Sequence, residues 1–191
     1  YPIQMTLKKL EDIYGLEEVL GQGGMKKIFR ARDHKSGRWV AMAKILKEPS
    51  RENTERFFRE ARLTASLQHP NIVPIYDMGL SENGEAYFTM ELLKGQSLAK
   101  VIKSASEVGE NEFDLSTSLD IFARICDAIE YAHSRGVIHL DLKPENIQLG
   151  EYGEVLVFDW GLARILTDDD LEINEGELDP NELNDVTLAG K

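Results

Sequence analysis

The sequence predicts an α+β chain whose first half is rich in strands and whose second half is helical. Two observations support this fold class. Short β-prone runs, separated by turn residues, recur between residues 13 and 92. Residues 115–134 carry apolar side chains at helical spacing along one face, which predicts a long helix. The length of 191 residues is enough for one large domain or two small lobes.

The first half is predicted to be a set of strands with one helix among them. The strands are expected over 13–20, 26–46 (two strands around a turn at Lys35, Ser36 and Gly37), 69–80 and 84–92. The first of them leads into a glycine cluster, residues 21–24. Residues 51–68 mix apolar and charged side chains in the pattern of an amphipathic helix of about four to five turns.

The second half begins where the composition changes near residue 95. The helix over 115–134 is expected to stop at Gly136, since glycine is favoured just after a helix. Two short β-like runs, "IQL" and "EVLVF", follow. Residues 167–191 then hold nine acidic residues and one basic residue, with few apolar ones, which predicts a mobile segment.

Composition and charge exclude several classes of function. The net charge of −12 disfavours nucleic acid or anionic lipid as a partner. The single cysteine, Cys126, excludes an intramolecular disulfide and favours a reducing, cytoplasmic setting. No apolar run reaches the roughly 18 residues of a membrane span, and no signal peptide is visible at Tyr1-Pro2-Ile3-Gln4.

One short stretch, "VIHLDLKPENIQL", gathers the residue types of a phosphoryl-transfer site. Asp141 could accept a proton from an attacking hydroxyl. Lys143 could neutralise a phosphate that is being transferred. Asn146 offers a hard oxygen ligand suited to magnesium, and Asp159, at the end of the next strand, offers a second one. Taken singly, Asp141 and Asn146 could also be ordinary turn residues.

Three features upstream could hold nucleotide phosphates. Lys44 lies on a predicted strand, and Glu60 follows 16 residues later on the predicted helix, where it could pair with that lysine. The glycine cluster at 21–24 would let backbone approach a phosphate closely. A dinucleotide-binding fold needs a helix after such a cluster, but another strand follows here, so that fold is set aside.

These stretches resemble a protein kinase, in particular the bacterial members of the eukaryotic-type serine/threonine family. The similarity is carried, in family order, by "LGQGGMKKIF", "AMAKIL", "FFREARLTASLQHPNIVPIYDMG", "YFTMELLKG", "VIHLDLKPENIQL" and "VFDWGLAR", which together cover residues 13–166. The resemblance implies a two-lobe fold: a small β-rich lobe with one helix, and an incomplete helical large lobe. It also implies a serine/threonine kinase that uses ATP and Mg²⁺ on protein substrates.

The family pattern implies a role for each matching residue. Asp141 would be the catalytic base and Lys143 the contact to the γ-phosphate, with Asn146 and Asp159 as magnesium ligands. Lys44 would bind the α- and β-phosphates and pair with Glu60. The remaining nucleotide contacts would come from Gly21, Gly23 and Ile28 in the glycine loop and its following strand, from Met90 as gatekeeper, and from Glu91, Leu92 and Leu93 in the hinge.

Four positions depart from the family pattern. Lys26 replaces the third glycine of the loop, where it would add positive charge near phosphate or simply stiffen the loop. Met42 stands two residues before Lys44, where a small alanine usually covers adenine. Gln148 occupies the usual leucine position beneath adenine, and Trp160 replaces a usual phenylalanine. These changes bear on nucleotide affinity more than on catalysis.

Leu140 is a further departure, directly before the predicted base. The family usually has an arginine here, which pairs with a phosphate on the activation segment. Leucine cannot form that charge-assisted contact, worth roughly 1.5–3 kcal/mol. We therefore expect that phosphorylation of Thr167 or Thr187 is not needed for activity.

The organisation that follows has three parts: a small lobe over 1–94, a partial large lobe over 95–166, and an acidic activation-segment stretch over 167–191. The family would continue past Lys191 with further helices, so the chain is expected to be a fragment or a truncated kinase, cytoplasmic or the cytoplasmic part of an anchored protein. The helix face over 119–132 would then be exposed and favour a homo-oligomer. The alternative function is a kinase-like scaffold without catalysis.

Overall fold

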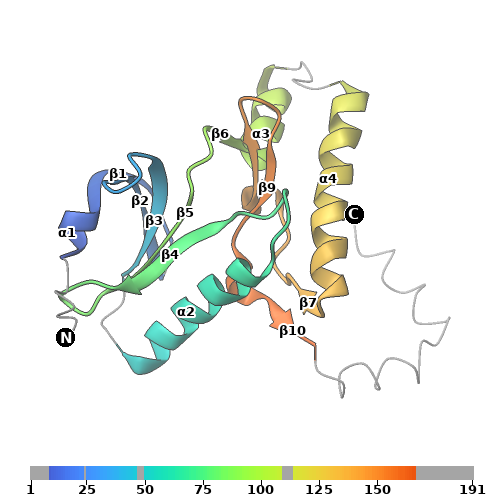
Figure 1. Cartoon of the computed structure of the whole chain (residues 1–191). Helices are drawn as coiled ribbons and strands as arrows, with labels where there is room; N and C mark the ends of the chain where they lie inside the picture. The colour runs from blue at the N-terminus through green and yellow to red at the C-terminus, as the bar shows by residue number, and fades with distance from the viewer. Residues whose placement is uncertain (1–8, 24, 47–49, 109–113, 167–191) are drawn as a thin grey trace.

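The computed structural model describes residues 9–23, 25–46, 50–108 and 114–166. Figure 1 shows a β-sheet with helix α2 beside it, followed by a second part built from two helices and short strands. This arrangement confirms the predicted α+β class with a β-rich first part and an only partly helical second part. The predicted acidic segment, 167–191, lies outside the described residues.

The first part is a five-stranded antiparallel sheet in the order β1-β2-β3-β5-β4. Its strands are β1 (Tyr14–Gln22), β2 (Lys26–Asp33), β3 (Trp39–Ile45), β4 (Ile75–Leu80) and β5 (Ala86–Glu91). A one-turn helix, α1 (Leu10–Ile13), precedes β1. The turn between β2 and β3 is closed by Asp33, whose carboxylate accepts hydrogen bonds from Ser36 Oγ (2.6 Å) and from the Lys35 backbone N–H (2.9 Å).

Two separate apolar clusters cover the two faces of this sheet. On one face, Val40 and Met42 of β3 pack with Ala31, Tyr87 and the α1 segment. On the other face, Ala43 and Ile45 of β3 pack with Phe57 and Ala61 of helix α2. Successive side chains of a strand point to opposite faces, so odd and even positions of β3 belong to different clusters.

Helix α2 (Arg51–Ser66) lies beside the sheet, next to β4, and extends toward the second part of the molecule (Figure 1). It begins after Ser50, whose side chain accepts a hydrogen bond from the Asn53 backbone N–H at 3.1 Å. This cap satisfies one of the backbone donors left open at the start of a helix. The helix contacts β4 and β5 on one side and the short 3₁₀ helix η2 on the other, so it can connect the two parts.

The second part has two α-helices, α3 (Leu98–Val108) and α4 (Leu115–Ser134), and three short pairings of strands. Its strands are β6 (Gly95–Ser97), β7 (Val137–Ile138), β8 (Ile147–Gly150), β9 (Val155–Val157) and β10 (Arg164–Ile165). They pair as β6-β8-β9 and as β10-β7. Two 3₁₀ helices, η1 (Pro144–Asn146) and η2 (Trp160–Leu162), lie next to β8 and β9.

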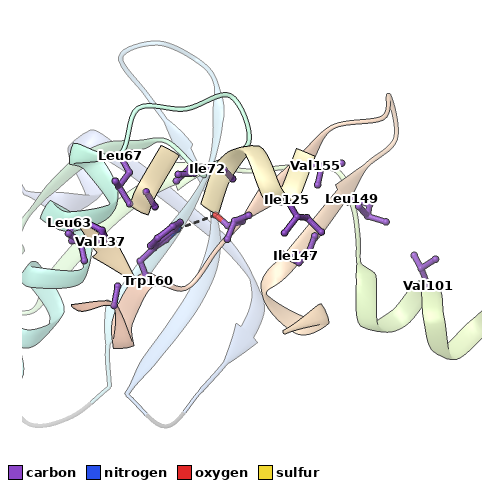
Figure 2. Packing of buried hydrophobic residues seen from close by; sticks show 14 residues of the cluster. Leu63, Leu67, Ile72, Val101, Ile125, Val137, Ile147, Leu149, Val155 and Trp160 are labelled. Carbon is purple, nitrogen blue, oxygen red and sulfur yellow. Dashed lines mark hydrogen bonds between the residues drawn. The ribbon is translucent and has the colours of Figure 1, made fainter. Parts of the chain in front are cut away.

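The core of the second part is built around Trp160. This side chain is 1% exposed and packs within a cluster drawn from α2, α4 and strands β7, β8 and β9 (Figure 2). Its indole N–H points to the Val157 carbonyl oxygen at 3.4 Å. Helix α4 contributes Ile125, Ala128 and Ala132 to the same cluster. The large indole therefore fixes η2 against the body of the second part.

Several predicted boundaries agree closely with the structure. The long helix covers the predicted 115–134, is capped by Asp114, and ends before Gly136, whose φ of 68° suits glycine. Helix α3 was not predicted, because its apolar residues follow the strand-like Gly95–Ser97 without a clear capping signal. Among the described residues, no helix is both long and apolar enough to cross a bilayer.

Candidate active site

Asp141 lies in the loop between β7 and η1, and the structure holds it from both sides. Its backbone N–H donates to His139 Nδ1 at 3.2 Å, while His139 Nε2 donates to the Phe158 carbonyl at 3.0 Å. His139 is buried and its ring lies 4.5 Å from the Trp160 ring, centroid to centroid. The histidine therefore connects the loop to the segment that follows β9, in the structural role expected of a packed residue.

The Asp141 carboxylate, Lys143 and Asn146 form one hydrogen-bonded group. Lys143 Nζ donates to both carboxylate oxygens of Asp141, at 2.9 and 2.7 Å. Asn146 Nδ2 donates to Asp141 Oδ2 at 3.1 Å and to the Asp141 backbone carbonyl at 2.8 Å. These bonds, that of Lys143 above all, lower the pKa of Asp141, so it is a carboxylate at neutral pH. The same contact raises the pKa of Lys143.

Asn146 and Asp159 lie on adjacent backbone segments. The Phe158 backbone N–H donates to the Asn146 carbonyl at 2.8 Å, and β8 pairs with β9 through Ile147 and Val157. Asp159 has a left-handed backbone, with φ of 59°, which aspartate tolerates better than most residues. Asn146 uses its amide nitrogen within the protein, so its amide oxygen is the atom available to a ligand.

The side-chain oxygens of Asn146 and Asp159 suit Mg²⁺, which needs few protein ligands, better than they suit a metal ion that is enclosed by protein alone. Mg²⁺ is usually held by one or two protein oxygens, with phosphate oxygens and water completing its octahedron. Within the described ranges, no group of three or more His, Cys, Asp or Glu side chains is placed to enclose a metal ion. Asn146 and Asp159 therefore remain the predicted oxygen ligands of a nucleotide-bound Mg²⁺.

A single ammonium group, that of Lys26, joins three separate elements. Lys26 Nζ forms an ion pair with Glu60 on α2 and a second one with Asp159 Oδ1 at 2.9 Å. Burial alone would lower the pKa of Lys26, but the two carboxylates outweigh it and hold the pKa above its ordinary value. For Glu60, burial raises the pKa, and Lys26 offsets only part of that effect. Gly161 packs beside the same carboxylates: a β-carbon there would lie 3.1 Å from Glu60 Oε2.

The predicted pair of Lys44 with Glu60 is wrong. Lys44 Nζ instead pairs with Glu85 Oε2 at 2.7 Å, on the opposite face of the sheet from α2. The physical reason is strand parity, since Lys44 shares its face with Met42 and lies opposite Tyr87. The sequence did contain a signal for this error, because Met42 fits poorly as the small residue that the family places two positions before its lysine.

The predicted glycine loop is formed by the end of β1 and the start of β2. The Gly23 backbone N–H donates to the Lys26 carbonyl at 2.9 Å, which closes a tight turn. A β-carbon built at Gly21 would meet no atom within 4 Å, and one at Gly23 would meet only the Lys26 carbonyl, at 3.9 Å. One side of this turn is therefore open to a ligand.

The predicted adenine contacts come from β2, β5 and the connection after β5. Ile28 and Met90 are partly buried against the cluster beneath the sheet. Glu91 ends β5, and Leu92 and Leu93 lie in the connection to β6, partly buried. Gln148, on β8, is also partly buried and pairs in register with Ser97. The adenine contacts of these residues remain a prediction.

Leu140 stands directly before Asp141 and brings no charge to it. Its side chain is 61% exposed, and its backbone is left-handed, with φ of 61°. A bulky residue in that region is strained by roughly 1–2 kcal/mol. The loop therefore holds this conformation through its neighbours, His139 and Asp141, and not through Leu140 itself.

The fold and the site define a class of protein: a β-rich lobe followed by a loop that groups Asp141, Lys143 and Asn146 next to Asp159. Residues 14–178 match the protein kinase domain, and the chain belongs to that family. It is similar to serine/threonine-protein kinase PknD of Chlamydia trachomatis serovar D, with 43% identity over 159 residues, which are 78% of this chain and 17% of the relative.

Two further relatives bear the same name. The one from Protochlamydia amoebophila is 40% identical over 166 residues, 81% of this chain and 17% of its own. The one from Chlamydia felis is 35% identical over 193 residues, 93% of this chain and 20% of its own. The chain thus spans only about a fifth of the length of the relatives that it matches, which are longer proteins.

Proposed function

We propose that this chain is the catalytic part of a serine/threonine protein kinase, which transfers the γ-phosphoryl group of ATP to hydroxyl groups of proteins. The observation that carries the proposal is the hydrogen-bonded group of Asp141, Lys143 and Asn146. A backbone hydrogen bond from Phe158 to Asn146 joins this group to the segment of Asp159. Together with Asp159, that group combines a base, a cation and two oxygen ligands, which are the parts that phosphoryl transfer requires.

Each residue has a role that follows from its contacts. Asp141, a carboxylate at neutral pH, accepts a hydrogen bond from the substrate hydroxyl and orients it. Lys143, already beside Asp141, faces the transferred phosphoryl group with its positive charge. Asn146 and Asp159 hold Mg²⁺, which when bound neutralises charge on the phosphates.

The nucleotide would lie between the glycine turn and the connection after β5. Gly21 and Gly23 leave the turn open for phosphates. Ile28, Met90 and Leu93 offer apolar contacts to adenine, and the connection after Glu91 would supply the backbone hydrogen bonds, since the Glu91 N–H itself donates to Pro74. Glu60, partly buried on α2, positions a cation near the phosphates.

The proposed function implies a protein substrate, and the exposed face of α4 suggests a second protein partner. The substrate is a protein that presents serine or threonine, since the lysine two residues after the base is the serine/threonine pattern. Helices α3 and α4 also leave an open apolar groove of about 540 Å³ between them. Phe122 of α4, 63% exposed, lines this groove, and Leu119, 57% exposed, lies on the same helix, so a homo-oligomer through the exposed face of α4 is part of the proposal. A cytoplasmic setting, with the chain as part of a longer protein, fits the single cysteine.

A binding experiment tests the proposal. Calorimetric titration with ATP and Mg²⁺ should give saturable binding, and phosphotransfer to a basic protein should be detectable with labelled ATP. The Asp141→Asn variant should keep nucleotide binding but lose transfer by about 10²–10⁴-fold. Absence of binding at millimolar nucleotide would favour the scaffold alternative, which no observation among the described residues currently supports.

A further inference from the structure

The register of β2 and β3 shows which lysines lie on the face of the sheet that carries helix α2. Ile28 pairs with Ala43, and Lys26 pairs with Ile45. Residues directly opposite each other in an antiparallel pair share a face, as do residues two apart on one strand. Lys26, Ile28, Ala43 and Ile45 therefore all lie on the face that carries helix α2. Lys27 and Lys44, also paired, lie on the other face.

The contacts agree with this parity. Ala43 and Ile45 pack with Phe57 and Ala61 of α2, and Lys26 reaches Glu60, one residue from Ala61. Lys27 instead lies over the Phe29 ring at 5.4 Å, and Lys44 pairs with Glu85. Of these three lysines, Lys26 alone contacts Glu60 and Asp159.

The unusual residues at positions 26 and 42 can then be explained together. A lysine stands where the third loop glycine is expected, and Ala43 stands at the position of β3 that faces α2. With Ala43 as the reference position, the residue two before it is Ala41, which is small, so Met42 is no longer in conflict with an adenine site. Lys26 thus supplies from β2 the charge that β3 lacks on this face.

We propose that Lys26, and not Lys44, is the lysine that binds the nucleotide phosphates, held in place by Glu60. This inference rests on the proposed function and names a further residue of that same site. Lys26 begins β2 directly after the glycine turn, and its ammonium already contacts Asp159, the predicted magnesium ligand. Lys26 therefore lies between the glycine turn and the residue that would hold the metal ion, where its positive charge would stabilise a nucleotide phosphate.

The alternative is that the Lys26 ion pairs serve only the folded structure. The two cases differ in which ligand is affected. A phosphate contact changes the affinity for ATP and leaves that for adenosine unchanged. A purely structural role would change the affinities for both, because it acts through the shape of the whole cleft.

The test compares three single variants of the full 191-residue chain: Lys26→Met, Lys27→Met and Lys44→Met. Lys27 is the matched control, being adjacent in sequence and on the opposite face. Calorimetry would measure dissociation constants for Mg²⁺·ATP and for adenosine, and circular dichroism would check that each variant is folded. Lys26→Met should bind Mg²⁺·ATP at least about tenfold more weakly, with adenosine affinity within about twofold. Phosphotransfer by Lys26→Met should fall on the order of 100-fold in kcat.

The two control variants should stay within about twofold of wild type for both ligands. A second test is the double variant Lys26→Met/Ala43→Lys, which returns a lysine to the same face from β3 and should recover part of the preference for ATP over adenosine. The assignment is overturned if Lys44→Met, and not Lys26→Met, loses ATP affinity, or if Lys26→Met weakens both ligands equally. A wild-type chain that binds no nucleotide would instead overturn the proposed function, and the assignment with it.

Discussion

The loop from Asp141 to Asn146 and the five-stranded sheet both contribute residues to the proposed site, but they fix these residues in different ways. In the loop, Asp141, Lys143 and Asn146 lie within six residues, and Lys143 and Asn146 both donate hydrogen bonds to the Asp141 carboxylate. In the sheet, successive residues of β3 lie on opposite faces. An error of one residue along the strand therefore places Lys44, instead of Ala43, on the face of helix α2. Local spacing is therefore a safer guide to a loop than to a strand.

Of the tests of this comparison, the largest effect is expected at Asp159, the proposed magnesium ligand, which follows β9 and forms an ion pair with Lys26 of β2. Asp159→Asn should lower phosphotransfer by about 10²–10³-fold and weaken the dependence of ATP binding on Mg²⁺, because an amide neutralises the cation poorly. A magnesium titration at fixed ATP measures this. Asp120→Asn, a surface change on α4, is the control. Unchanged magnesium dependence in Asp159→Asn would separate Asp159 from the metal and break the link between loop and sheet.

Much of the fold could be predicted from the sequence, and the reasons are local. Helices α2 and α4 carry apolar faces and capping side chains, Ser50 and Asp114, which mark their starts within one or two residues. The pattern of Asp141, Lys143 and Asn146 is equally local. The side chain that meets Glu60 was missed because it depends on contacts between Lys26 and residues 34 and 133 positions away in the chain.

Substitution of one tryptophan in each part compares how strongly the free energy of unfolding depends on each side chain. Trp160→Ala should lower the free energy of unfolding by about 3–5 kcal/mol, because the indole is 1% exposed and packs against His139. Trp39→Ala is the matched substitution in the sheet. Trp39 is only partly buried, beneath the guanidinium groups of Arg30 and Arg32, so its loss should cost clearly less. Denaturant unfolding measures both, and equal losses would contradict the central role of Trp160.

A smaller effect is expected in the turn between β2 and β3, which sets the register of the sheet. The hydrogen bond from Ser36 lowers the pKa of Asp33, with help from backbone N–H groups. A lowered pKa stabilises the fold above the ordinary value of about 3.9, and that contribution is lost as pH falls through the folded-state pKa. Asp33→Asn should therefore cost about 1 kcal/mol at neutral pH.

The pH dependence of that cost is the sharper test. The difference in unfolding free energy between wild type and Asp33→Asn should be constant above about pH 5 and should shrink below about pH 4. Unfolding curves between pH 3 and pH 7 would show it. A difference that grows as pH falls would mean that Asp33 is not held as a carboxylate by the turn.

The smallest expected effect concerns the loop and Leu140. Without a charge at this position, phosphorylation at Thr167 or Thr187 has no partner there, although both threonines lie outside the described residues. Thr167→Ala and Thr187→Ala should leave phosphotransfer within about twofold of wild type. A steep loss in either variant, measured on protein with known phosphate content, would show that another cation reads that phosphate.

The ion pairs of Lys26 have a mechanical consequence. The ammonium belongs to the strand that leaves the glycine turn, yet it is bonded to α2 through Glu60. Lifting the turn away from the cleft must therefore either pull on the helix or break this bond. In a chain whose cation sits on β3, turn and helix could move independently. Here, the glycine turn can move independently of α2 only after the Lys26–Glu60 ion pair is broken.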